Sequence, residues 1–149
     1  MKFNNSKDFK INPNTPIEFY VKEITYISGQ GNSEKWVKVK SDGFEVFYCQ
    51  WQTTYGDRAL TAESLGIKES ATIKTFYNPK VIEKITKSQT LIVKNLDNNA
   101  FENGKPNSKC SNLFELWGGV DNVLQENKFI EFRVRRFESL WLRLYCKKH

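Results

Sequence analysis

The sequence has few of the residues on which enzyme active sites depend. Its single histidine is His149, the last residue, so a Ser-His-Asp triad would require a tightly docked chain terminus. The GxxxxGKS/T, GxGxxG and HExxH patterns are absent. Carboxylates are plentiful, but Glu45, Glu115 and Glu131 occupy alternating strand positions, where a solvated face is the ordinary explanation. We therefore expect that the protein is not an enzyme.

Cysteines and long apolar runs are also scarce. Cys49, Cys110 and Cys146 have no CxxC spacing, which favours free thiols over a metal site, and Cys49 lies in an aromatic strand that would bury it. No apolar stretch approaches the roughly 20 residues that span a bilayer. The first 16 residues are polar and lack the apolar core of a signal peptide. We expect no cofactor, no membrane partner and a cytoplasmic site of synthesis.

Aromatic residues and positive charge are what the chain has in quantity. Aromatics make up 14% of 149 residues and apolar residues 39%, which favours one folded domain rich in strands. Only four prolines interrupt that pattern. The net charge of +6 suggests an anionic partner such as nucleic acid, but the lysines are scattered. The charge is therefore equally consistent with a role in solubility.

Alternation of apolar and polar residues predicts a mainly β domain over residues 17–137. Residues 17–27 and 35–40 alternate around a glycine turn and predict a hairpin. One short helix is expected over residues 57–65, from Asp57 as N-cap to Leu65, with Gly66 as its stop. Residues 81–87 fit no single assignment. About six or seven strands without a βαβ rhythm favour a small β-barrel or sandwich. The other strands are expected at residues 43–51, 70–77, 90–96 and 129–136.

Four further features stand apart from this pattern. Residues 1–16 read as an N-terminal arm, and residues 97–112 as a long polar loop. Gly118 and Gly119 predict a turn or β-bulge. Residues 138–149 form an apolar tail that should dock on its own domain or on a neighbour.

Two groups of side chains leave alternatives open. Arg133, Arg135 and Arg136 form the densest basic cluster, which could contact phosphates or an acidic neighbouring subunit, or pair locally with glutamates. Four aromatic residues could stack on nucleic-acid bases, but strand spacing makes core positions the commoner explanation. These four are Trp51, Tyr55, Phe76 and Tyr77.

Several segments, taken in order, resemble the head–tail joining (head-closure, or stopper) proteins of tailed bacteriophages. Residues 46–81 contain VFYCQWQ, then a GxxALxAESLG segment, then ESATIKTFYNPKV. Residues 91–94, a VDNV segment at 120–123 and FIEFRVRR at 129–136 follow. The resemblance covers most of residues 17–137. It departs from the family pattern in the 97–112 insertion and in the apolar tail.

The resemblance implies a small β-barrel with a short helix that works in the virion neck after assembly in the cytoplasm of a bacterial host. Copies would form a ring, of twelve subunits or else six, below the portal and its adaptor protein. The ring would close the head, pass double-stranded DNA through its lumen and dock the tail through a tail-terminator protein. Alternatives are another neck component, such as a tail terminator itself, or an oligonucleotide-binding β-barrel protein.

A ring of this kind requires subunit contacts and a gate. The candidate ring interface comprises Leu140, Trp141, Leu142, Leu144 and Tyr145 of the tail together with Arg133, Arg135 and Arg136. The candidate gating loop comprises Asn98, Asn99, Phe101, Asn103, Gly104 and Lys105, and the turn near residues 29–35 is a second candidate for the gate.

Overall fold

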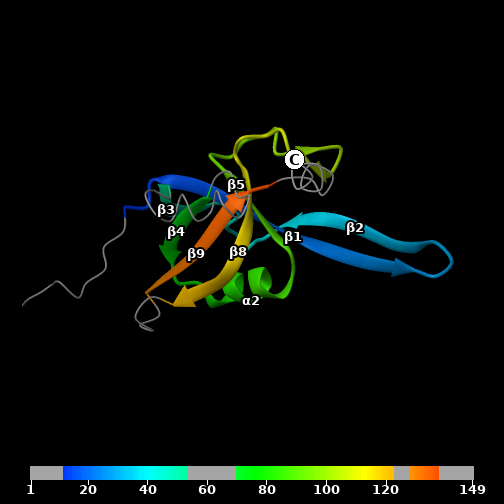
Figure 1. Cartoon of the computed structure of the whole chain (residues 1–149). Coiled ribbons are helices and arrows are strands. Elements are labelled where there is room, and N and C mark those ends of the chain that lie inside the picture. The colour runs from blue at the N-terminus through cyan, green and yellow to red at the C-terminus, as the bar shows by residue number, and fades with distance from the viewer. Residues whose placement is uncertain (1–11, 54–69, 123–127, 138–149) are drawn as a thin grey trace, which may run out of the picture.

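The computed structural model describes residues 12–53, 70–122 and 128–137, and these residues form a mainly β domain (Figure 1). One helix, α2, covers Pro79–Lys87. The strands are β1 (Thr15–Ile27), β2 (Gly31–Lys38), β3 (Phe47–Thr53), β4 (Ser70–Phe76), β5 (Thr90–Lys94), β6 (Phe101–Glu102), β7 (Lys105–Pro106), β8 (Leu113–Asn122) and β9 (Phe129–Arg136).

Seven of these strands form one antiparallel sheet that nearly closes on itself. The strand order is β2-β1-β3-β4-β9-β8-β5, and β5 also pairs with β1. Ile17 lies at the junction, since it is in register with Phe47 of β3 and with Lys94 of β5. The result is a near-closed ring of six strands, with β2 as an extra strand beside β1. The predicted mainly β fold is confirmed, and the barrel describes it better than a sandwich.

The interior of the ring is filled by every second residue of its strands. Ile130, Phe132 and Val134 of β9 are all at most 1% exposed, as the alternation predicted. Phe19 joins two walls, because its ring centroid lies 5.6 Å from that of Phe47 and 5.8 Å from that of Phe132. Aromatic contacts across the interior therefore connect β1, β3 and β9.

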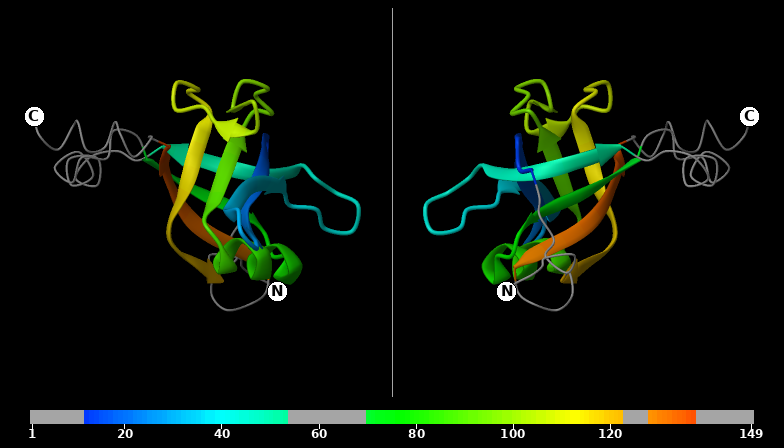
Figure 2. Two further views of the ribbon diagram at one scale, coloured as in Figure 1. Left: turned by 90° about the vertical axis from the view of Figure 1, so that its right-hand side faces the viewer. Right: turned by 90° about the vertical axis from the view of Figure 1, so that its left-hand side faces the viewer.

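The described helix lies in the segment whose assignment the sequence left open. The Asn78 side chain accepts hydrogen bonds from the backbone N–H groups of Lys80 and Val81, and Pro79 occupies the first turn. Val81 and Ile85 are buried in the core, so α2 covers one open end of the barrel (Figures 1 and 2). Asn78 and Pro79 therefore follow the end of β4 closely and begin α2. The helix predicted at residues 57–65 lies outside the described residues.

Two predicted strands have different bounds in the structure. The predicted strand at residues 43–51 begins later, at Phe47, because Ser41 and Phe44 close a tight turn in which Asp42 and Gly43 have positive φ. The second strand of the hairpin spans Gly31–Lys38 rather than residues 35–40.

The hairpin of β1 and β2 extends well beyond the barrel. Pairing of β1 with β5 ends at Val21, whereas pairing with β2 continues to Ile27. Residues 22–36, which we call the projecting hairpin, therefore leave the barrel as two strands (Figure 1). Ile24 and Tyr26 are 61% and 74% exposed on it.

The capping of α2 predicts a measurable contribution to stability. Asn78→Ala removes the oxygen that caps two backbone N–H groups, and we expect a loss of about 1 kcal/mol in the free energy of unfolding. Asn78→Asp keeps a capping oxygen and should stay within about 0.5 kcal/mol of the wild type. Urea unfolding followed by circular dichroism measures both. Equal losses in the two variants would contradict the capping role.

Candidate interaction surfaces

On one face of the projecting hairpin, Trp36, Ile24 and Tyr26 form an apolar stripe, and each lies beside a polar residue of the other strand. Residues opposite each other on β1 and β2 share a face, so Lys22 lies beside Trp36, Ile24 beside Glu34, and Tyr26 beside Asn32. At the base, the Trp36 ring lies 6.4 Å from that of Phe101, and Lys22 and Glu34 form an ion pair of 3.1 Å. The stripe thus runs from a packed base to an exposed tip.

The sequence held a signal for this surface that the hairpin prediction did not use. Apolar residues occupy odd positions up to Val21 and even positions at Ile24 and Tyr26. In a strand this change of phase moves the apolar side chains to the other face. It occurs where β1 leaves the barrel wall.

Charged groups hold the base of the hairpin against the barrel. The Lys38 ammonium lies 2.7 Å from a carboxylate oxygen of Glu18 and 3.7 Å from one of Glu45. The hydrogen bond to Glu18 holds the pKa of Lys38 well above its usual range. Burial, with the nearby Glu18 charge, raises the pKa of Tyr20. Lys38 therefore stays charged and fixed at the point where the hairpin emerges.

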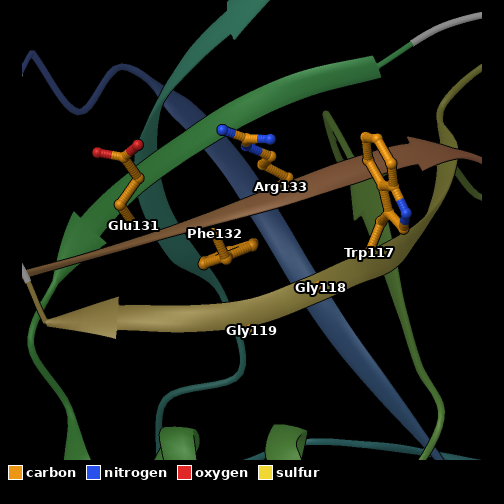
Figure 3. A pocket seen from close by; sticks show the side chains of 6 residues that line it. All are labelled: Trp117, Gly118, Gly119, Glu131, Phe132 and Arg133. Carbon is orange, nitrogen blue, oxygen red and sulfur yellow. The ribbon is translucent and has the colours of Figure 1, made fainter. Parts of the chain in front are cut away.

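A hollow lies between β8 and β9, at the two glycines for which the sequence predicted a turn or bulge. The register of the two strands shifts between Trp117 and Asp121, which confirms a bulge. Gly118 and Gly119 contribute no side chain, and a Cβ at either would meet nothing within 4 Å. The hollow has a volume of about 390 Å³, and we call it the β8–β9 hollow (Figure 3). Its lining residues are Trp117, Gly118, Gly119, Glu131, Phe132 and Arg133.

The rim of the β8–β9 hollow combines an indole with both signs of charge. Figure 3 shows Trp117, Glu131 and Arg133 pointing to one side of the strands, whereas the buried Phe132 points to the other. Arg133 is exposed, and Glu131 lies 3.9 Å from the ammonium of Lys74. Such a rim suits a partner group with an aromatic ring and flanking charges.

The three arginines of β9, Arg133, Arg135 and Arg136, differ in exposure and in their partners. The Nε atom of Arg135 donates to a Glu115 oxygen at 2.8 Å, and Glu115 is only 5% exposed. Local pairing with a glutamate therefore holds for Arg135. Arg133 is exposed and Arg136 is half-buried. A role of Arg133, Arg135 and Arg136 in a ring interface stays a prediction. The tail residues of that interface lie outside the described residues: Leu140, Trp141, Leu142, Leu144 and Tyr145.

The candidate gating loop is a folded excursion with an anchored base. Asp97 accepts hydrogen bonds from the Asn99 backbone N–H at 2.8 Å and from the Asn112 side chain at 2.9 Å. These bonds hold the pKa of the Asp97 carboxyl below its usual range. Phe101 packs on Tyr20, with ring centroids 4.5 Å apart. The other candidates are exposed: Asn98, Asn99, Asn103, Gly104 and Lys105.

This excursion covers a second apolar cluster on the outer face of β5. Leu91 and Val93 belong to that cluster with Ala100 and Cys110, whereas Ile92 faces the barrel interior. Strand β5 is therefore buried on both faces. A gating movement of residues 97–112 stays a prediction, and their base is part of the packed structure.

Cys49 and two of the four candidate stacking aromatics, Trp51 and Tyr77, belong to the core. Cys49 is fully buried, and burial raises its pKa to about 12, so the predicted structural thiol is confirmed. Trp51 packs edge-on against Phe114, with ring centroids 4.7 Å apart, and Tyr77 also lies against the core. Phe76 is different, because it is 55% exposed. Tyr55 lies outside the described residues.

The described residues contain neither a recognisable metal site nor a spanning helix. No group of three or more His, Cys, Asp or Glu side chains among them could hold a metal ion. Within residues 12–53, 70–122 and 128–137, there is no helix with the length and apolar character needed to cross a membrane. In comparisons with known proteins, no family model and no curated protein matches the chain.

The Glu115–Arg135 pair should matter for stability. Arg135→Met removes the guanidinium from a buried carboxylate, and we expect a loss of about 2–3 kcal/mol in the free energy of unfolding. Arg133→Met, on the exposed position of the same strand, should change it by less than about 0.5 kcal/mol. Chemical denaturation distinguishes the two. Similar effects in both variants would argue against a specific role for the pair.

The anchored base of the loop predicts a local effect of Asp97. Asp97→Ala removes the acceptor of the Asn99 and Asn112 hydrogen bonds, so amide hydrogen exchange in residues 98–111 should accelerate about tenfold or more. Exchange in β9 should stay unchanged. Glu102→Ala, at an exposed position of the same segment, is the matched control and should leave the loop protected. Unchanged exchange in the Asp97 variant would show that other contacts hold the loop.

Proposed function

We propose that the protein is a structural component of the neck of a tailed bacteriophage. Copies would form a ring that closes the DNA-filled head below the portal and its adaptor and docks the tail. The projecting hairpin is the observation that carries the proposal. Its tip exposes Ile24, Tyr26 and Ile27 away from the barrel, and such apolar groups gain from burial against another protein.

The distribution of the resembling segments supports the same proposal. Among the described residues, VFYCQWQ falls largely on β3, SATIKTF on β4, residues 91–94 on β5 and FIEFRVRR on β9, so these resembling segments follow the walls of the barrel. The described departure from the family pattern, residues 97–112, lies outside the barrel over β5. A shared scaffold with a variable covering segment fits a family whose members meet different partners.

The arrangement of charge supports a passage for DNA better than a tight binding groove. Many lysines of the described domain pair with carboxylates, as Lys22 does with Glu34 and Lys80 with Asp42. Within the described residues, much of the positive charge is therefore paired locally, and the lysines are scattered along the sequence. A lumen with this character attracts the phosphate backbone weakly, which lets a genome move through it.

Negative-stain microscopy with native mass spectrometry of the purified chain tests the proposal. The protein is examined alone and mixed with the neighbouring connector proteins of the same gene cluster. We expect rings, of twelve or six subunits, or recruitment of monomers onto an adaptor ring. Binding to a tail tube instead of the adaptor would assign it to the tail-terminator position.

A monomer that ignores these proteins would contradict the proposal. If it also retained single-stranded DNA, with an affinity that falls steeply as salt rises, the chain would be an oligonucleotide-binding barrel. Fluorescence anisotropy with a labelled oligonucleotide at several salt concentrations distinguishes that result from weak electrostatic attraction.

A further inference from the structure

We propose that the projecting hairpin enters the β8–β9 hollow of a second copy, with Tyr26 as the residue that fills it. The inference rests on the proposed function, since it identifies the subunit contact from which a ring would be built. In this contact the exposed face of the hairpin is buried in one site on another copy of the same chain.

The hairpin has the reach and the exposed groups that this contact requires. Tyr26 lies five residues beyond Val21, where pairing with β5 ends, and a strand rises about 3.3 Å per residue. Its ring is therefore carried roughly 17 Å from the barrel wall. Tyr26 is 74% exposed, and Ile24 on the same face is 61% exposed.

The β8–β9 hollow offers a matching site. The absence of side chains at Gly118 and Gly119 leaves about 390 Å³ open beside the Trp117 indole. A tyrosine placed there would meet that indole, and aromatic pairs favour such edge or offset contacts.

Both surfaces carry charges of both signs: the hairpin has Lys22 and Glu34, which pair with each other at 3.1 Å, and the rim has Glu131 and Arg133. The exposed Arg133 at the rim would face Glu34, which shares the face of Ile24 and Tyr26. Glu131 of the rim would face Lys22 on the same side of the hairpin. Both contacts join opposite charges at a solvated edge, where such pairs orient a partner more than they increase its affinity.

The strand order explains why this contact would build a ring. In the cycle β1-β3-β4-β9-β8-β5, strand β9 is three strands from β1 in either direction. The hairpin and the hollow therefore lie on opposite walls of the barrel (Figure 2). A contact between unlike surfaces on opposite walls is head-to-tail, and it closes into a ring when the rotation between subunits allows it.

Disulfide trapping tests the contact directly. Asn32→Cys lies opposite Tyr26 on the hairpin, and Gly119→Cys lies in the hollow, where a Cβ meets nothing. The background carries Cys146→Ser, while Cys49 and Cys110 are buried. After mild oxidation we expect a ladder of dimers and larger oligomers from the double variant. A mixture of the two single variants should give dimers at least tenfold above either variant alone.

Two variants that keep the cysteines native test the same contact in assembly. Tyr26→Ala removes the inserted ring and Gly119→Trp fills the hollow, and each should abolish ring formation while circular dichroism stays unchanged. Tyr48→Ala, which removes an exposed tyrosine from β3, is the matched control and should still assemble.

The outcomes separate this inference from the proposed function. If both the Tyr26 and the Gly119 variants form rings like those of the wild type, or if the introduced cysteines do not cross-link, the inference is overturned and the neck assignment stands. Dimers of the Asn32→Cys variant alone would indicate a twofold hairpin contact and also overturn it. Cross-linked ladders from a protein that never forms rings, alone or with the connector proteins, would support the contact and contradict the neck assignment.

Discussion

The double pairing of β1 is the constraint on which the rest of the structure depends. Its first residues pair with β3 on one edge and β5 on the other, and Ile17 takes part in both ladders. This double use bends the sheet into a near-closed ring around Phe19 and Phe132 and pairs β5 on its second side. The strand is 13 residues long, and the barrel uses it only as far as Val21. The remaining length becomes the projecting hairpin.

Burial on two faces of one strand connects the barrel to its covering segment. Ile92 faces the interior, while Leu91 and Val93 face residues 97–112. Since Asp97 ties the base of that segment to Asn112, a gating movement would be confined to its tip, near Asn103 and Gly104. The same segment contacts the base of the hairpin, because the Phe101 ring lies 6.4 Å from that of Trp36. A movement of this segment would therefore also alter the packing at the base of the hairpin.

The charge of this protein acts locally more than globally. Glu18 and Lys38 fix the hairpin base, and Glu115 and Arg135 join β8 to β9. Within the described residues, these pairs neutralise charge close to where it lies. The hairpin tip and the β8–β9 hollow combine aromatic side chains with charges of both signs.

Local patterns in the sequence predicted most of the strands, a turn or bulge at Gly118 and Gly119 and the alternation along β9. A strand with one face on a core must alternate, and Ile130, Phe132 and Val134 do so without interruption. The helix at Pro79–Lys87 was left open because the segment is only nine residues long, and so short an apolar pattern fits a strand as well as a helix. Tertiary structure alone decided the closure through Ile17, the two-sided burial of β5 and the opposite placement of hairpin and hollow. Each of these depends on pairing between segments far apart in the chain, and alternation along one strand does not specify its neighbours.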